Sequence, residues 1–241
     1  MSELTGHVRA AADQYQMIAP GDRIAVAVSG GKDSMYLLYA LLSLKRYYPK
    51  PFELTAVTID PGFNGQEGDY SAVTAFCTEQ GIRHIIKHSD LYQTIFEEHR
   101  PTSPCSLCAR MRRGMLHNLC VQHDLNKIAL GHHLDDAVQT VLMNLFYGGR
   151  IGCFSPVTFL SRKKLTMIRP LIFCEEGHIR RQANRLSLPI LKSQCPVDGI
   201  TARKDTADLI QKLERDFPDL KAKLIGAIQR GGINGWQKGS E

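Results

Sequence analysis

The stretch IAVAVSGGKDSMYLLYALL, residues 24–42, decides the fold. Its first five residues form an apolar, β-branched run typical of a buried strand, and its last eight carry apolar side chains at helical spacing. Six small or polar residues connect the two: Ser29, Gly30, Gly31, Lys32, Asp33 and Ser34. Glycine lets the backbone approach a ligand closely, and the first turn of a helix presents unpaired N–H groups at the positive end of its dipole. The stretch therefore predicts a strand, a turn and a helix whose junction binds phosphate. An ordinary turn that uses glycine for its backbone freedom is the alternative.

The composition is that of an ordinary globular protein. Of 241 residues, 43% are hydrophobic and 22% are charged, enough for one good-sized core. No apolar run approaches the roughly 20 residues that cross a bilayer, and residues 1–6 lack the basic and apolar segments of a signal peptide. We therefore expect a cytoplasmic protein without membrane contact. In that compartment its seven cysteines are free thiols or metal ligands rather than disulfides.

Basic side chains are unevenly distributed along a chain whose net charge is +6. One cluster consists of Arg110, Arg112 and Arg113. A second follows residue 149 and consists of Arg150, Arg162, Lys163, Lys164, Arg169, Arg180, Arg181 and Arg185. Clustered cations favour a polyanionic partner such as nucleic acid, because phosphate contacts supply much of its affinity. The charge alone fits a solvated basic face equally well, and no RNA-binding module is recognisable in the sequence.

Strand-like and helix-like segments alternate through the first half of the chain. We expect strands at residues 24–28, 52–59, 83–87 and 127–130, and helices at residues 7–19, 35–42, 70–80, 105–123 and 134–147. This alternation predicts an α/β fold, a parallel sheet with helices on both faces. Ligands of such sheets bind outside the carboxyl ends of the strands, where residues 29–34, Asp60 and Gly131 would converge.

The pattern changes after residue 149. Residues 157–160 and 165–168 flank the basic sequence SRKK and predict a hairpin with a basic tip. A helix is expected at residues 175–186, and two more between residues 201 and 230, broken at Phe217 and Pro218. We expect residues 1–149 to form the ligand-binding core. Residues 150–241 would add a basic hairpin and a helical part that packs on this core without being an independent domain.

The sequence PCSLC at residues 104–108 is the second strong signal. A CxxC at the start of a helix places Cys105 and Cys108 where the helix dipole lowers thiol pKa values, which suits a metal site or redox exchange. Two structural thiols are the third interpretation. Zinc would want four ligands at compact spacing, and the sequence has no second CxxC. Cys195 is the candidate third ligand. The other cysteines lie in apolar or helical segments, where we expect buried core thiols: Cys77, Cys120, Cys153 and Cys174.

The sequence GHHLDD at residues 131–136 follows an expected strand and opens an expected helix. Asp135 and Asp136 fall in the first helical turn, where carboxylates complement the helix dipole. Because they face the phosphate site, either could instead hold Mg²⁺ or position a substrate. His132 and His133 are adjacent at a strand end and point to opposite sides, so we interpret them as packing or substrate-edge groups rather than metal ligands.

Four motifs occur in a fixed order: SGGKDS, PCSLCARMRRGML, GHHLDDAVQTVLMNLFYGGR and IRPLIFCEE, followed by a late cysteine. With them the chain resembles the TtcA family of tRNA 2-thiocytidine synthetases, a branch of the PP-loop ATP pyrophosphatases, which cleave ATP to AMP and pyrophosphate. The resemblance implies that residues 1–149 bind ATP and Mg²⁺ through residues 29–34, Asp60 and Gly131. It also implies a [4Fe–4S] cluster with one iron free to carry sulfur, held by three cysteines: Cys105, Cys108 and Cys195.

The activity that this resemblance implies is tRNA sulfur transfer. ATP would adenylate the C2 oxygen of a cytidine in the anticodon loop, and sulfur would then displace AMP. In this scheme Asp33 contacts Mg²⁺, and Lys32 stabilises the departing pyrophosphate. Asp135 and Asp136 are further catalytic candidates. Arg112 would stabilise the substrate oxygen, with a phosphate contact as the alternative role.

The implied partners are tRNA and a cysteine desulfurase or another sulfur donor, and a homodimer is compatible with the resemblance. Three other functions remain open. One is a PP-loop ligase that acts on a small molecule. Another is a tRNA lysidine synthetase, which shares SGGKDS but has no use for the CxxC. The third is a non-catalytic Fe–S redox sensor built on an ATP-binding fold.

Overall fold

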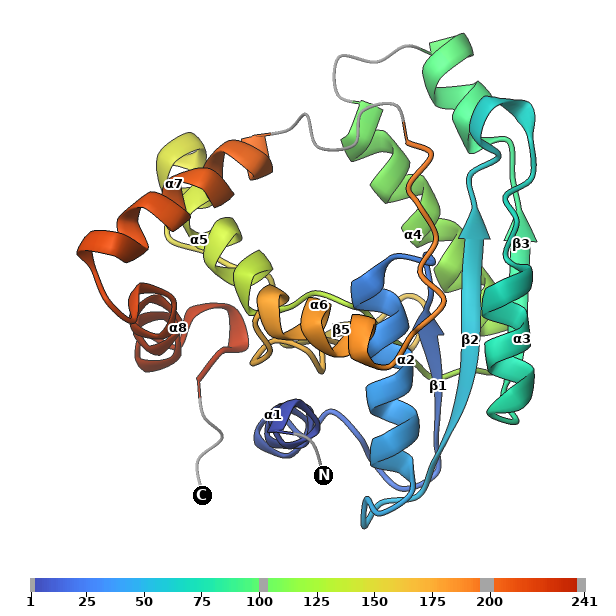
Figure 1. Cartoon of the computed structure of the whole chain (residues 1–241), viewed down its shortest axis with the longest axis horizontal. Coiled ribbons are helices and arrows are strands. Elements are labelled where there is room, and N and C mark those ends of the chain that lie inside the picture. The colour runs from blue at the N-terminus through green and yellow to red at the C-terminus, as the bar shows by residue number, and fades with distance from the viewer. Residues whose placement is uncertain (1–2, 100–103, 196–201, 238–241) are drawn as a thin grey trace.

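The computed structural model describes residues 3–99, 104–195 and 202–237 (Figure 1). Its strands are β1 (Asp22–Ala27), β2 (Phe52–Asp60), β3 (Arg83–His88), β4 (Lys127–Ala129), β5 (Val157–Leu160) and β6 (Leu165–Ile168). Its α-helices are α1 (Glu3–Gln14), α2 (Lys32–Lys45), α3 (Ser71–Glu79), α4 (Pro104–Gln122), α5 (Leu134–Gly148), α6 (Glu176–Arg185), α7 (Ala202–Asp216) and α8 (Leu220–Arg230). Shorter helical segments are η1 (Phe63–Gly65), the π-helix η2 (Gln93–His99) and η3 (Ile233–Gly235).

The strands form one sheet in the order β3-β2-β1-β4-β6-β5. Neighbouring strands from β3 to β6 run parallel, and β5 pairs antiparallel with β6. The chain places β2 and β3 on one side of β1 and β4 on the other, so the direction of winding reverses at β1. In open parallel sheets this reversal marks the ligand-binding crevice at the carboxyl ends of the strands. The predicted α/β class and parallel sheet are confirmed.

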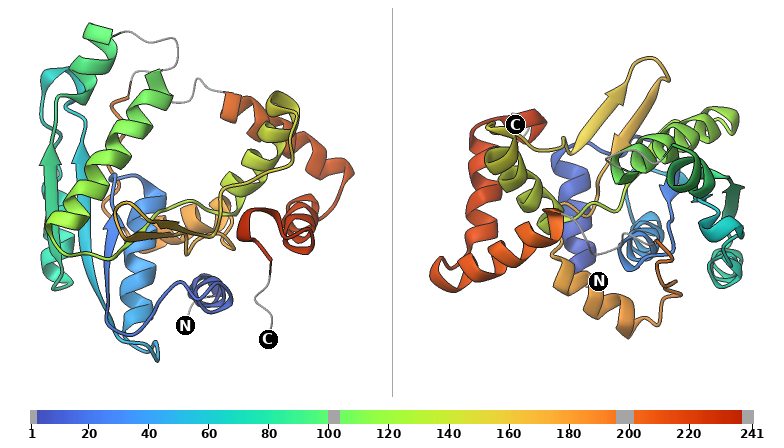
Figure 2. Two further views of the ribbon diagram at one scale, coloured as in Figure 1. Left: turned by 180° about the vertical axis from the view of Figure 1, so that it is seen from behind. Right: turned by 90° about the horizontal axis from the view of Figure 1, so that it is seen from above.

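Alternating residues of the central strands face two separate cores. Ile24 and Val26 of β1 pack into a core with α1, α2, α5 and α6, whereas Ala25 faces a core that α4 and η2 cover. This alternation follows from the period of two in a strand, and it requires apolar residues on both faces of a parallel sheet. The views in Figure 2 show the helices on either side of the sheet.

The hairpin predicted at residues 157–160 and 165–168 is present as β5 and β6. Because β6 pairs with β4, this hairpin extends the main sheet. The break predicted at Phe217 and Pro218 separates α7 from α8, and residue 201, the expected start, lies outside the described residues. Both helices pack against α5, to one side of the sheet (Figure 2). The division of the chain at residue 149 stays a prediction.

The N-terminal helix differs from the prediction of residues 7–19. It ends at Gln14, because Gln16 adopts a left-handed φ of +47° and the following residues are not helical.

Trp236 near the other end of the chain is fully buried, and its indole N–H donates to the carbonyl of Phe154 at 2.7 Å. The Tyr15 hydroxyl donates to the Trp236 carbonyl at 3.0 Å, which ties the two ends of the described chain together. None of the described helices is long and apolar enough to cross a membrane.

Candidate functional site

The predicted phosphate loop connects β1 to α2 at the carboxyl end of β1. Gly30 adopts a φ of +83°, and Gly31 precedes the first helical residue. The Ser29 N–H donates to Ser34 Oγ at 3.1 Å, and the Ser34 hydroxyl donates to the Gly31 carbonyl at 2.8 Å. These bonds hold the loop closed over the first turn of α2. The strand, turn and helix predicted from the sequence are therefore present, with the positive end of the helix dipole at the sheet edge.

Two glycines permit close contacts with this loop. A Cβ at Gly30 would lie 2.7 Å from Leu191 Cδ1, and the Leu191 N–H donates to the Gly30 carbonyl at 2.9 Å. A Cβ at Gly131 would lie 3.3 Å from the carbonyl carbon of Asp33. The loop is thus in contact with the end of β4 through Gly131 and with the segment before Cys195 through Gly30.

Lys32 is held by two carboxylates. Its ammonium lies 3.0 Å from Asp33 and 2.9 Å from Glu176 of α6. Burial alone would lower the pKa of Lys32, but the hydrogen bond with Glu176 and the charge of Asp33 outweigh it and raise the pKa. The lysine is therefore charged beside the loop. Glu176 ends the IRPLIFCEE motif, but its contact with Lys32 could not be predicted, because nothing in the local pattern links it to the distant SGGKDS motif.

Asp60 ends β2 and is only 1% exposed. Its carboxylate accepts the N–H groups of Gly62 at 3.2 Å and Gly68 at 2.9 Å, and it lies 2.9 Å from His88 Nδ1. Burial alone would raise the pKa of Asp60, but the backbone amides and the His88 ring outweigh it and lower the pKa. Asp60 lines a cavity next to the loop, and its contacts shape the turn after β2.

A cavity of about 490 Å³ joins the loop to two of the predicted thiols. Ser29 lies on its wall together with Cys108 from the first turns of α4, Arg112 one turn further, and Cys195. Cys105 lies on the same helix before Cys108 and is exposed. The structure therefore brings the CxxC helix and the late cysteine to the phosphate loop.

The charges that act on Cys108 include those of Arg112 and the other two thiols. Burial raises the pKa of the Cys108 thiol, the guanidinium of Arg112 lowers it, and the neighbouring Cys195 and Cys105 raise it further, so that the net direction is upward. Within residues 3–99, 104–195 and 202–237, no three His, Cys, Asp or Glu side chains are grouped closely enough to hold a metal ion. The donors themselves, two thiols on the cavity wall and a third on the same helix, suit iron–sulfur chemistry. The predicted core thiols are buried: Cys77, Cys120, Cys153 and Cys174.

His133 lies among the carboxylates at the start of α5. Its Nδ1 is 3.6 Å from Asp135, and its Nε2 is 3.4 Å from Asp136 and 3.9 Å from Asp33. Burial alone would lower the pKa of His133, but the nearby carboxylates of Asp135, Asp136 and Asp33 outweigh it and raise the pKa. His133 thus connects the start of α5 to the start of α2, while its neighbour His132 faces another cavity, as expected for adjacent residues in extended backbone.

Both carboxylates of the GHHLDD motif are engaged by distant residues. Asp135 accepts the Glu176 N–H at 2.7 Å and pairs with Lys221 of α8 at 2.8 Å. Burial alone would raise the pKa of Asp135, but the neighbouring His133 ring and the ammonium of Lys221 outweigh it and lower the pKa. The other carboxylate, Asp136, pairs with Arg203 of α7 at 2.9 Å. These contacts fix α6, α7 and α8 against the start of α5.

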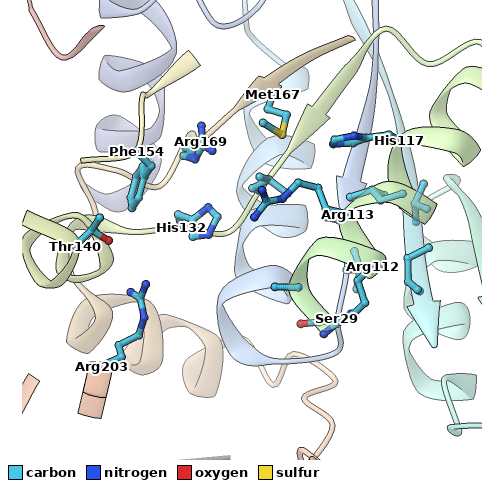
Figure 3. A pocket seen from close by; sticks show the side chains of 17 residues that line it. Ser29, Arg112, Arg113, His117, His132, Thr140, Phe154, Met167, Arg169 and Arg203 are labelled. Atoms are coloured by element: carbon cyan, nitrogen blue, oxygen red, sulfur yellow. The ribbon is translucent and has the colours of Figure 1, made fainter. Parts of the chain in front are cut away.

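A second cavity of about 530 Å³ lies between α4 on one side and α5 and α7 on the other (Figure 3). It shares Ser29 and Arg112 with the thiol-lined cavity. Its remaining charged and titratable side chains are Arg113, His117, His132, Arg169 and Arg203. Arg113 and Arg169 belong to the two basic clusters noted in the sequence, whereas Arg203 belongs to neither. That these arginines converge on one cavity could not be predicted from the sequence.

Comparisons with known proteins agree with this arrangement. Residues 4–192 match the PP-loop domain family. Over 223 residues the chain is 43% identical to the tRNA-cytidine(32) 2-sulfurtransferase of Geobacter metallireducens and 42% identical to that of Geobacter sulfurreducens, with 91% of this chain and 86% of each relative covered. Among solved structures it is similar to the U34-tRNA thiolase NcsA from Methanococcus maripaludis with its [4Fe-4S] cluster. That similarity has a TM-score of 0.76 at 26% identity, over 93% of this chain and 77% of that one.

Proposed function

Because the chain belongs to the PP-loop family and, within it, to the tRNA-cytidine(32) 2-sulfurtransferases, we propose that it replaces the C2 oxygen of cytidine 32 in tRNA by sulfur at the expense of ATP. One observation carries the proposal: the phosphate loop residue Ser29, the guanidinium of Arg112 and the thiols of Cys108 and Cys195 line a single cavity. Activation of an oxygen and delivery of sulfur then take place in adjacent positions.

In the activation step the C2 oxygen attacks the α-phosphorus of ATP, the bond between the α- and β-phosphates breaks, and pyrophosphate leaves. We assign binding of these phosphates to residues 29–34, whose loop opens α2, with Gly131 allowing the close approach of β4. Lys32 would exchange its contact with Glu176 for the departing pyrophosphate, and Asp33 would hold Mg²⁺. Asp60 keeps the turn after β2 in place beside the nucleotide.

In the second step sulfur bonds to C2 and AMP leaves with the original oxygen. We assign Cys105, Cys108 and Cys195 as the ligands of a [4Fe–4S] cluster, a donor set that suits it. When bound, such a cluster supplies an iron without a protein ligand that can carry the sulfur to be transferred. Arg112 lies in both cavities, where it can stabilise negative charge on the activated oxygen.

We assign Asp135 and Asp136 to positioning the C-terminal helices and His133, because their carboxylates are engaged in ion pairs with α7 and α8. The partners that follow from the proposal are tRNA and a sulfur donor such as a cysteine desulfurase. A cytoplasmic location follows from the same substrate.

Mass spectrometry of tRNA nucleosides tests the proposal. Cells without the gene should lack 2-thiocytidine, and the wild-type gene should restore it. Asp33→Ala should not restore it, whereas Asp216→Ala, a change at an exposed aspartate at the end of α7 that lines neither cavity, should. An unchanged nucleoside profile in the deletion would contradict the function, and turnover that gives ADP and phosphate in place of AMP and pyrophosphate would contradict the mechanism.

A further inference from the structure

Arg169 forms the far wall of the arginine-lined cavity and is only 6% exposed. Its guanidinium donates to the carbonyl of Ser155 and to Thr158 Oγ1, and its central carbon lies 5.1 Å from the centre of the Phe154 ring. Its buried Nε–H has no hydrogen-bond partner in the described part of the chain. The side chain is thus fixed in place while one of its donors is unused (Figure 3).

The positive charge of this wall is not balanced. No acidic side chain is among the described residues that line the cavity, and none of the described carboxylates forms an ion pair with Arg113 or Arg169. Burial and the charge of Arg113 lower the pKa of Arg169 to about 10, and burial together with Arg169 lowers the pKa of His132 to about 4. A buried cation without a counter-charge destabilises a fold. The cavity therefore favours an anionic ligand.

The location separates this anion from the phosphates of ATP. Arg169 directly follows β6, which lies two strands from β1 in the sheet order, or about 10 Å at the usual strand spacing. The phosphate loop follows β1 itself. The two ends of the cavity are nevertheless continuous, because Ser29 and Arg169 both line it. A ligand that spans them has an anionic group at Arg169 and a neutral part that reaches Ser29.

We propose that Arg113 and Arg169 together bind a backbone phosphate next to the target nucleotide of the RNA, so that its base extends across the cavity toward Ser29. This inference rests on the proposed function. Figure 3 shows Arg113 reaching from α4 toward the wall formed by His132, Phe154 and Arg169. The volume of about 530 Å³ lies within the range of about 300–1,000 Å³ in which proteins hold small ligands. Guanidinium groups suit this role because their fork matches phosphate oxygens.

Binding of a synthetic anticodon stem-loop, measured by fluorescence anisotropy over a series of salt concentrations, tests the proposal. Arg113→Gln and Arg169→Gln should each weaken binding on the order of tenfold and lower the slope against salt by about one. Arg46→Gln removes the same charge from an exposed site at the end of α2 away from the loop, and it should change neither quantity. Because Arg113 is exposed, its variant keeps the test valid if the Arg169 variant does not fold.

Replacing one backbone phosphate of the RNA by a neutral methylphosphonate tests whether that phosphate is the anion that the two arginines bind. A methylphosphonate on one side of cytidine 32 should weaken binding to the wild-type protein by the same factor as Arg113→Gln, and it should cause no further loss in that variant. Calorimetry should give the same ATP affinity for both proteins. A loss of ATP affinity without a loss of RNA affinity would assign the subsite to ATP and overturn the proposal, as would equal behaviour of Arg113→Gln and Arg46→Gln. If the wild-type protein binds no stem-loop at all, the proposed function fails together with this inference. If the stem-loop binds but a methylphosphonate on either side of cytidine 32 leaves the affinity unchanged, this inference alone is overturned.

Discussion

Replacing Gly30 by alanine tests whether the phosphate loop and the segment before Cys195 form one packed unit. Gly30 has a φ of +83°, and an added Cβ would lie 2.7 Å from Cδ1, 3.0 Å from Cγ and 3.1 Å from Cβ of Leu191. Because the base of the leucine side chain is also close, a change of rotamer does not relieve the contact. The left-handed conformation costs an L-residue about 1–2 kcal/mol, and overpacking adds about 1–3 kcal/mol. We expect Gly30→Ala to lower the free energy of unfolding by about 2–5 kcal/mol and to weaken ATP binding.

Urea unfolding of two glycine variants separates these contributions. Gly21 has a φ of +79°, but no heavy atom lies within 4 Å of an added Cβ. Gly21→Ala should therefore show only the conformational cost, about 1–2 kcal/mol. Adding Leu191→Ala to Gly30→Ala should recover part of the extra loss in the free energy of unfolding, since the smaller side chain makes room for the methyl group. Equal losses of stability in Gly30→Ala and Gly21→Ala would contradict a close contact with Leu191, and so would a double variant no more stable than Gly30→Ala.

Three further predictions concern the thiols, the carboxylates and the hairpin. Cys195→Ser should abolish iron binding and thiolation, whereas Cys77→Ser should cost only stability. Iron and sulfide assays of anaerobically purified protein would show this, and a Cys195→Ser protein with full iron would mean that another residue is the third ligand. The folded-state pKa of Asp135 is depressed, so its stabilisation is complete above about pH 4 and is lost as the pH falls further. Asp135→Asn should therefore flatten the acid limb of the unfolding free energy measured in urea, and equal acid slopes in both proteins would contradict this. Glutamine at residues 162–164 should reduce the salt slope of tRNA binding by about one for each phosphate that the hairpin tip no longer binds, and an unchanged slope would exclude the tip from the RNA interface.

The central strands could be predicted from the sequence because both faces of a parallel sheet are buried. A run such as residues 24–28 is apolar throughout, and the glycines after it mark the turn. The pairing of β6 with β4 could not be predicted, because the four residues of β6 suit a separate hairpin as well as an added strand. The early end of α1 was also missed. Met17 and Ile18 continue an apolar pattern, but they reach the core through non-helical backbone after Gln16.

The same limit applies to the site, where local spacing predicts the position of a side chain but not its partners from other elements. The motif GHHLDD places carboxylates at the start of a helix near the phosphate loop, and this much follows from local spacing. Whether a carboxylate there meets a metal ion or an amine depends on side chains from other elements, and α8 supplies Lys221 to Asp135. In the same way α6 supplies Glu176 to Lys32, while the backbone N–H of Glu176 donates to Asp135. The start of α6 therefore contacts both the phosphate loop and the anchor of the C-terminal helices. A nucleotide that draws Lys32 away from Glu176 acts on the element that also holds Asp135, the carboxylate that anchors α8. Helix α8 in turn packs against α7, which contributes Arg203 to the arginine-lined cavity.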